Sequence, residues 1–191
     1  MKLYGSYTSP FVRHCRIALA ESSIPWTLNE ADYAMSAKES PTKRVPYLKD
    51  GEVFLSDSSS ILKHIREKSG RPFFPKTAEF ELYCITNTLL DTSVNLFLLE
   101  KEGLTPENTP YLKRQTERIQ SGLELLKKAQ YPTVTPFADH VIRLGCYLEW
   151  AVFRERLAVE DLGPLSALVE SLNSWDEFKK THPSFHPANA N

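Results

Sequence analysis

The chain has 191 residues, enough for one large domain or two small ones packed together. Hydrophobic residues make up 41% and charged residues 25%, a globular balance that excludes an intrinsically disordered chain. The 23 basic and 24 acidic side chains nearly cancel, so no overall field attracts nucleic acid or an anionic membrane.

Several familiar sequence signals are missing. Neither GxGxxG nor GxxxxGK[ST] occurs, and no unbroken apolar run approaches the roughly 18 residues that cross a bilayer. The first residues lack the apolar core of a secretory signal. Three widely spaced cysteines, Cys15, Cys84 and Cys146, fit a reducing compartment and lack zinc-site spacing. We therefore expect a soluble, cytoplasmic protein without a metal site.

The first part of the chain alternates strand and helix signals. Residues 2–7 predict a strand that ends in a turn. Ser9 and Pro10 then form a helix start, with Ser at the N-cap and Pro at the first helical position, and the helix is expected to reach Ala20. Residues 26–31 fit a second strand.

A hairpin and a helix complete this part. Residues 44–49 and 52–55 flank Asp50-Gly51, which is a favoured two-residue hairpin turn. Residues 56–58 then open a helix that stops near Gly70. The order β-α-β followed by β-β-α predicts a small mixed sheet with helices.

From about residue 78 onward, strand signals nearly vanish. Apolar residues at helical spacing predict a long helix that ends near Gly103, a helix that begins at Thr105-Pro106, and a third over 137–152. Shorter helices are expected at 165–172 and 175–180, and an irregular tail follows Lys180. We therefore expect two domains, an α/β domain over 1–75 and an all-α, helical-bundle domain over 76–191.

Three segments in the first domain carry a resemblance. Residues 4–13 (YGSYTSPFVR), 44–48 (RVPYL) and 55–61 (LSDSSSI) resemble the three N-terminal motifs of the glutathione S-transferase family. The helical second half, including Phe137-Ala138-Asp139 at a helix start, is similar to that family's C-terminal domain. The resemblance implies a thioredoxin-like domain, glutathione as co-substrate with no other cofactor, and a homodimer.

Ser9 is the candidate catalytic residue. A helix that begins at Ser9-Pro10 presents unpaired N–H groups and a partial positive charge of roughly +0.5, which favours a thiolate. A free thiol has a pKa of ~8.5, so a hydroxyl donor would help to ionise glutathione at neutral pH. The simpler alternative is that Ser9 only caps the helix.

Neighbouring residues remain alternatives for this role. Ser6, Tyr7 and Thr8 lie on the same loop, and other classes of the family use a Tyr hydroxyl from this strand end. Thiol-reducing relatives carry Cys before the proline. Ser9 at this position therefore favours thiol activation for conjugation over mixed-disulfide chemistry.

The second motif supplies candidate backbone contacts. The resemblance implies a cis proline at Val45-Pro46, where a glutathione cysteinyl unit could pair with the Val45 backbone like an added strand. Lys43 and Arg44 are candidate partners for the glycyl carboxylate, with a slight preference for Lys43. An ordinary trans proline at an edge strand, beside a solvated basic pair, is the alternative.

The third motif suits the amino-acid end of the tripeptide. A γ-glutamyl group carries both an ammonium and a carboxylate, so it needs a counter-anion beside N–H donors. Asp57 supplies the anion, whereas Ser58 and the amides of the helix that it opens supply donors. As an alternative, Asp57-Ser58 is only a good helix cap.

The sequence thus predicts a glutathione transferase that conjugates reduced glutathione to a small hydrophobic electrophile. Two other readings stay open. One is a non-catalytic interaction module with the same fold, and the other is a glutathione-dependent reductase or isomerase. No motif specifies the electrophile.

Overall fold

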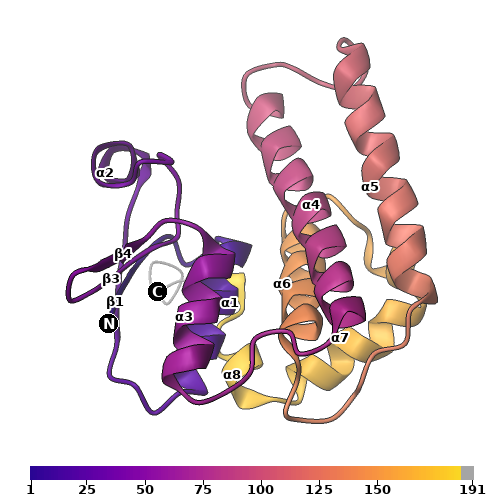
Figure 1. The fold of residues 1–191 in the computed structure, drawn as a ribbon. Coiled ribbons are helices and arrows are strands. Elements are labelled where there is room, and N and C mark those ends of the chain that lie inside the picture. The colour runs from indigo at the N-terminus through magenta and orange to yellow at the C-terminus, as the bar shows by residue number, and fades with distance from the viewer. Residues whose placement is uncertain (186–191) are drawn as a thin grey trace. The chain divides into compact units, whose positions relative to one another are not determined.

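A four-stranded sheet organises the first part of the chain. In the computed structural model, which describes residues 1–185, the strands are β1 (Lys2–Tyr4), β2 (Thr27–Asn29), β3 (Tyr47–Asp50) and β4 (Val53–Leu55). Their order is β2-β1-β3-β4 (Figure 1). β1 runs parallel to β2, whereas β3 is antiparallel to both β1 and β4. This mixed sheet is the thioredoxin-like arrangement that was expected.

Two helices pack against each other on one side of the sheet. They are α1 (Pro10–Ala20) and α3 (Ser58–Lys68) (Figure 1). Their inward side chains, together with those of β1 and β3, form a fully buried apolar core: Leu3, Val12, Ile17, Leu48, Ile61, Leu62 and Ile65. The predicted bounds of α1 agree with the structure, because Ser9 and Pro10 mark its start so clearly.

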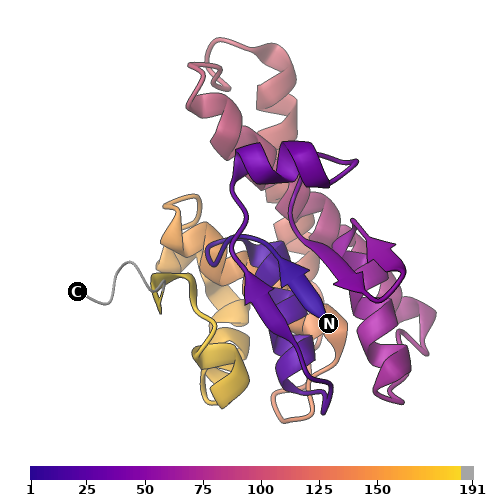
Figure 2. The ribbon, with the colours of Figure 1, turned by 90° about the vertical axis from the view of Figure 1, so that its left-hand side faces the viewer.

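The sequence patterns did not predict the helix α2 (Tyr33–Glu39). Asp32 caps this seven-residue helix by accepting a hydrogen bond from the Met35 amide at 2.8 Å. Ser36 is the one buried residue within it, so it lacks the apolar periodicity by which a helix is recognised. α2 lies beyond one end of the strands (Figure 2).

Gly5 brings the start of α1 close to the sheet. A Cβ atom at Gly5 would lie 2.3 Å from a methyl carbon of Val12, so no larger residue fits without displacement. The Gly5 amide also donates to the Asn29 carbonyl at 3.1 Å, which joins the end of β1 to the end of β2. These two contacts therefore hold the turn between β1 and α1 close to the end of β2 and to the first turn of α1.

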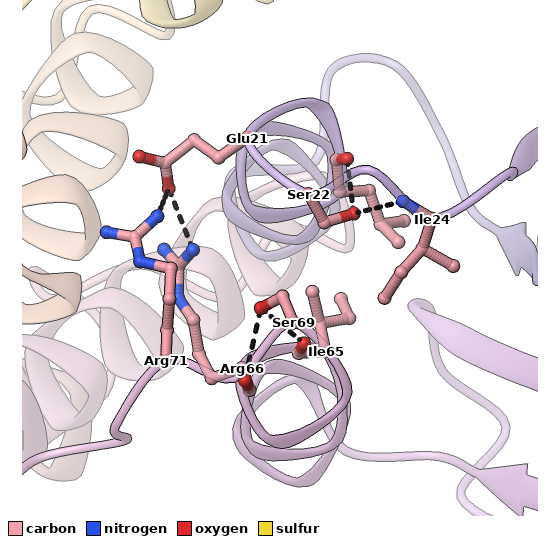
Figure 3. Close-up of polar contacts among 8 residues, drawn as sticks. Glu21, Ser22, Ile24, Ile65, Arg66, Ser69 and Arg71 are labelled. Atoms are coloured by element: carbon pink, nitrogen blue, oxygen red, sulfur yellow. Dashed lines mark hydrogen bonds and ion pairs between the residues drawn. The ribbon is translucent and has the colours of Figure 1, made fainter.

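An ion-pair cluster joins the far ends of α1 and α3. The Glu21 carboxylate lies 2.8 Å from the Arg66 guanidinium and 2.9 Å from that of Arg71 (Figure 3). Arg66 is almost completely buried, at 1% exposure. In the same region the Ser69 hydroxyl donates to the carbonyls of Ile65 and Arg66, closing the end of α3.

The second part of the chain is helical. The long helices α4 (Thr77–Glu100) and α5 (Pro110–Lys128) both pack in this part, α4 against α5 and against α6 (Asp139–Phe153). Every residue from Asp139 to Ala151 is buried, so α6 is its central helix. The predicted all-α second half is confirmed.

The start of α5 differs from the prediction. The helix begins at Pro110, behind Thr109, and not at Thr105-Pro106. Asn108 accounts for the difference, because its side chain accepts from the Thr105 amide at 2.9 Å and donates to the Gly103 carbonyl at 3.0 Å. These bonds hold residues 103–108 in a closed turn.

Shorter helices follow α6. They are the 3₁₀ segment η1 (Val159–Leu165), α7 (Ser166–Asn173), α8 (Asp176–Lys179) and η2 (Pro183–Phe185). The expected helices at 165–172 and 175–180 agree with α7 and α8. A short 3₁₀ turn lies in the tail that was expected to be irregular, and residues 186–191 fall outside the described part.

Contacts divide the chain into two compact units. The first contains residues 1–75 together with the described residues from Leu172 onward, and the second contains Lys76–Ser171. The expected boundary after residue 75 agrees with this division. The C-terminal segment was expected in the helical domain 76–191, but it packs with the first unit through Arg13 of α1, as described below.

α4 is the one helix among residues 1–185 that is long and apolar enough to cross a membrane, by length and composition alone. Scattered polar residues interrupt it, which is why no unbroken apolar run is visible in the sequence. A core helix of a soluble protein meets the same two criteria, and α4 packs against both α5 and α6. Only 28% of its most apolar stretch of 18 residues is buried within the chain.

Candidate functional site

The strand register brings the three motifs to one edge of the sheet. Tyr4 lies opposite Tyr47, and Leu48 lies opposite Leu55. Because β3 is antiparallel to its two neighbours, the end of β1, the start of β3 and the end of β4 lie at the same edge. The segments that follow β1, precede β3 and follow β4 are those that carry Ser9, Val45 and Asp57.

A side-chain contact ties the second motif to the third. The Thr42 hydroxyl lies 3.0 Å from the Ser40 hydroxyl and donates to the Ser56 carbonyl at 3.5 Å. This contact holds the loop before β3 against the residue that precedes Asp57. Sequence reasoning did not single out Thr42, because only the fold brings positions 42 and 56 together.

Ser9 stands at the start of α1 with its hydroxyl proton available. Its oxygen accepts a hydrogen bond from the Val12 amide at 3.4 Å, a long distance for such a bond, so Ser9 does cap the helix. Among residues 1–185 the hydroxyl makes no other hydrogen bond. A capping oxygen only accepts, so the hydroxyl can still donate to a ligand.

The alternative hydroxyls on this loop are differently placed. The Ser6 hydroxyl accepts from the Thr8 amide at 3.3 Å and lies 3.2 Å from the Thr8 hydroxyl, which engages both in the turn. The Tyr7 ring lies beneath the Arg16 guanidinium, whose central carbon is 4.9 Å from the ring centre. Ser9 is the candidate that stands at the helix start itself.

Val45 presents backbone groups at the edge of the sheet. The Val45–Pro46 peptide bond is cis, as the resemblance implied. Val45 is half-buried, and within the described chain its amide and carbonyl form no hydrogen bond. These groups are therefore open to an added extended segment.

Lys43 lies in the loop that precedes this edge. It is exposed and has a φ of 54°, a left-handed conformation that is uncommon outside glycine. Its amide donates to the Ser40 carbonyl at 2.9 Å, which closes the turn after α2. No ion pair of its ammonium group is found among residues 1–185, so the charge can meet an incoming carboxylate.

Asp57 caps α3 with one of its two carboxylate oxygens. Oδ1 accepts from the Ser59 amide at 2.7 Å and from the Ser60 amide at 3.4 Å. In the described part of the chain Oδ2 has no hydrogen bond or ion pair. The capping role of Asp57 is thus confirmed, and this exposed side chain keeps one anionic oxygen that the cap does not use.

Ser58 is the first residue of α3 and is 4% exposed. Its carbonyl accepts a weak hydrogen bond from the Cys15 thiol at 3.9 Å, a buried contact between α1 and α3. Ser58 therefore helps to fix the start of α3 against α1. Its role as a glutathione donor stays a prediction, as do the roles of Ser9, Lys43, Val45 and Asp57.

The charges around α1 favour an anion. α1 contains no acidic residue, whereas Arg13 and Arg16 both lie on it. The buried Arg13 guanidinium donates to the Phe178 carbonyl at 2.9 Å and to the Thr181 hydroxyl at 3.2 Å, and it lies 4.0 Å from the centre of the Phe178 ring. Both bonds keep a positive charge buried in this helix.

Together these features make this end of the strands the candidate site for a small peptide-like ligand that carries an anionic group. A helix start with a hydroxyl proton, backbone groups without a partner and a carboxylate oxygen are the groups that such a ligand would need. No group of three potential metal ligands occurs among residues 1–185.

Comparison with known proteins agrees with this fold. Residues 3–73 match the sequence family described as Glutathione S-transferase, N-terminal domain. The thioredoxin-like sheet and the helical second unit share their fold with solved glutathione S-transferases. Residues 3–73 thus match the N-terminal domain of glutathione S-transferases, and the chain as a whole is similar to members of that family.

Similar proteins cover nearly the whole chain. An Escherichia coli GST-like protein, YibF, is 29% identical over 96% of this chain and 98% of its own length. Glutathione S-transferase Z2 of Arabidopsis thaliana is 25% identical over 98% of this chain and 92% of its own. A glutathione S-transferase of Methylobacillus flagellatus, solved with glutathione bound, has a TM-score of 0.81 at 21% identity, covering 95% of this chain and 98% of that chain.

Proposed function

We propose that the protein is a glutathione transferase that conjugates reduced glutathione to a small apolar electrophile. The observation that carries this proposal is the Ser9 hydroxyl, which stands at the start of α1 with no acceptor for its proton among residues 1–185. In this proposal Ser9 donates to the glutathione sulfur and stabilises its thiolate. No metal or redox cofactor enters the reaction.

The energies involved are sufficient. Lowering a thiol pKa by about two units requires roughly 2.7 kcal/mol. A hydrogen bond to a charged acceptor supplies about 1.5–3 kcal/mol, and a helix start adds roughly 0.3–1 kcal/mol. α1 itself carries no acidic side chain that would oppose these contributions.

The other motif residues would hold the tripeptide. The open Val45 backbone would pair with the cysteinyl unit, and the free Oδ2 of Asp57 would bind the γ-glutamyl ammonium. Ser58 and the first amides of α3 would donate to the γ-glutamyl carboxylate. Lys43 would meet the glycyl carboxylate.

The partners and the assembly belong to the same proposal. The acceptor is a small hydrophobic electrophile, and the working form is a cytoplasmic homodimer that binds neither nucleic acid nor membrane. Support for a second copy comes from α4, whose most apolar window is only 28% buried within one chain. A second copy of the chain would cover this helix.

The identity of residue Ser9 also bears on two rival functions. A glutathione-dependent reductase of this fold requires a thiol where this chain has Ser9. A non-catalytic interaction module would not need a hydroxyl with a free proton. Two solved isomerases, among them the zeta-class maleylpyruvate isomerase at a TM-score of 0.76 and 18% identity, share the fold with this chain.

The test is ultraviolet difference spectroscopy of the glutathione complex at neutral pH, in the wild type and in Ser9→Ala. We expect a thiolate band in the wild type that weakens in the variant. Conjugation of a reactive aryl halide should fall by roughly ten- to a hundredfold, the equivalent of one charge-assisted hydrogen bond.

Matched variants separate chemistry from folding. Ser9→Thr retains both the hydroxyl and the cap, so it should keep most of the thiolate signal. Asp32→Ala removes the cap of α2 and should leave the signal intact. An equal thiolate band in wild type and Ser9→Ala would transfer the role to another group, and failure to bind millimolar glutathione would favour an interaction module.

A further inference from the structure

The helical unit contains a cavity that opens to solvent and to which none of the three motifs contributes. Its volume is about 900 Å³, and its lining comes from α4, the loop between α4 and α5, α5, α6 and the segment that leads from α6 into η1. This volume lies in the range of roughly 300–1,000 Å³ that small-molecule sites occupy. All lining residues belong to Lys76–Ser171, so the cavity is a feature of this unit by itself.

The inner wall of the cavity is apolar. Leu96 of α4, Leu123 of α5 and Ala151 of α6 line it and are each less than a tenth exposed. Ile119 and Leu157 add further aliphatic surface. Because three helices contribute, the wall can cover an apolar body from several sides.

Carboxylates dominate the charged part of the lining. The acidic residues are Glu100, Glu107, Glu124, Glu155 and Asp161. The two basic residues are both paired already, Arg156 with Glu100 and Lys127 with Glu124, the latter at 2.8 Å. The cations of the lining therefore neutralise two carboxylates and leave an excess of negative charge.

The three remaining carboxylates are those that a ligand would meet. Glu107, Glu155 and Asp161 form no ion pair among residues 1–185. A hydrogen bond from the Thr105 hydroxyl lowers the pKa of Glu107, so this side chain stays ionised at neutral pH. An anionic ligand would be repelled at this rim, whereas an ammonium group would be attracted.

A buried pair of hydroxyls adds a donor to the apolar wall. The hydroxyls of Ser93 and Tyr147 lie 3.0 Å apart, and the two residues are 5% and 1% exposed. Two O–H groups share one mutual hydrogen bond, so one proton has no acceptor in the described part of the chain. A buried donor without an acceptor is costly, and a ligand acceptor would remove that cost.

We propose that this cavity binds an amphipathic organic amine. Its protonated nitrogen would meet Glu107, Glu155 and Asp161, while its apolar body, bearing a hydrogen-bond acceptor, would lie against Leu96, Leu123 and the Ser93–Tyr147 pair. This binding goes beyond the proposed transferase reaction and does not depend on it.

The test uses three fluorescent probes that differ only in their end group. On the same five-methylene linker, dansylcadaverine carries an ammonium, N-hexyl dansylamide carries a methyl, and dansyl-6-aminohexanoate carries a carboxylate. Each is titrated into the full-length protein with S-hexylglutathione present to fill the predicted transferase site. We expect the ammonium probe to bind tightest and the carboxylate probe weakest.

Variants locate the binding. Glu107→Gln and Asp161→Asn should each weaken binding of the ammonium probe by roughly twofold to fivefold, the usual range for a partly exposed ion pair. Neither should change binding of the other two probes. Glu117→Gln, a carboxylate on α5 outside the lining, is the matched control and should change nothing. Thr116→Leu places a larger side chain at a lining position and should weaken binding of all three probes by roughly tenfold, because it occupies space in which the apolar body of the probe would be buried.

Two results would overturn the proposal. One is equal affinity for the ammonium and methyl probes, which would mean that the carboxylates do not select the ligand. The other is probe binding that Thr116→Leu leaves unchanged, which would place the probe elsewhere. Glutathione affinity should be unaltered in every variant, so loss of this site is distinguishable from loss of the transferase site.

Discussion

At the residue scale, the candidate site depends on hydrogen-bonding capacity that the fold leaves unused. Ser9 and Asp57 are both helix caps, so the structural reading of each is correct. Each cap uses only part of its side chain, since Ser9 keeps a proton and Asp57 keeps one oxygen. Capping and ligand binding are therefore compatible in both residues.

Asp57→Asn separates these two roles. Asn is as good a cap as Asp, so the free energy of unfolding should change by only a few tenths of a kcal/mol. Loss of the negative charge should weaken glutathione binding by roughly tenfold, the equivalent of one charged hydrogen bond. Isothermal titration with glutathione and a urea unfolding curve measure the two effects.

The control for this variant is Asp32→Asn, which makes the same exchange at the cap of α2. It should alter neither quantity. If Asp57→Asn bound glutathione as tightly as the wild type, Asp57 would be a cap and nothing more.

At the element scale, buried polar contacts fix how the helices pair. Glu21 at the end of α1 contacts two arginines at the end of α3 and just beyond it. In the helical unit the Ser93–Tyr147 contact joins α4 to α6, and the Arg143 guanidinium of α6 donates to the Tyr83 hydroxyl of α4 at 2.9 Å. Because Arg66, Arg143 and Tyr147 are buried, removing one partner from such a contact costs more than at an exposed position.

Glu21→Gln should destabilise the first unit by about 3 kcal/mol, because it removes the carboxylate charge that lies 2.8 Å from the buried Arg66 guanidinium. Urea unfolding measures the change. The matched control is Glu67→Gln, which breaks an exposed ion pair with Lys63 and should cost less than about 0.5 kcal/mol. Equal losses in the two variants would show that burial of the Glu21 cluster has no special weight.

The burial of Tyr147 predicts how the stability of the helical unit changes at alkaline pH. Burial raises the pKa of Tyr147 to about 12, whereas an unfolded tyrosine titrates near 10. Between these values the folded chain keeps the proton that the unfolded chain loses. The contribution of this difference to the free energy of unfolding is complete below about pH 10. It is lost as the pH rises toward 12, and the loss amounts to up to about 3 kcal/mol.

Tyr147→Phe should therefore flatten the fall in unfolding free energy between about pH 10 and pH 12. Denaturant curves at a series of pH values check this slope. Tyr111→Phe, at an exposed position of α5, should leave the slope unchanged. A slope that is the same in Tyr147→Phe and wild type would contradict the buried titration.

At the scale of the whole molecule, the chain returns to its first unit at the end. The described residues from Leu172 onward pack with residues 1–75. The Phe178 carbonyl and the Thr181 hydroxyl accept hydrogen bonds from the Arg13 guanidinium of α1. Phe178 is fully buried. The α/β unit is thus completed by a segment far away in the sequence.

Phe178→Ala should reduce the free energy of unfolding by about 3–5 kcal/mol, the cost of a large cavity plus a lost contact with Arg13. Phe185→Ala, in the same segment but 60% exposed, should change it by less than about 0.5 kcal/mol. Thermal and urea unfolding compare the two. Similar small losses would mean that the C-terminal segment contributes little to the first unit.

The sequence by itself determined the local elements. Ser9-Pro10 sets the start of α1, Asp50-Gly51 sets the hairpin, and apolar spacing sets the long helices, because these signals act between residues that are close along the chain. Where the local signal was duplicated, as at Thr105-Pro106 and Thr109-Pro110, the choice depended on the Asn108 side chain. The sequence did not predict α2, because Ser36 is its one buried residue and no apolar periodicity marks the helix.

Only the tertiary structure decided what comes together. The strand register placed Ser9, Val45 and Asp57 at one edge, and the fold brought Thr42 to Ser56 and Arg13 to Phe178. The cavity between α4, α5 and α6 likewise has no local signature. These features join residues that are distant in the chain, and their pairing follows from packing the whole core rather than from any short pattern.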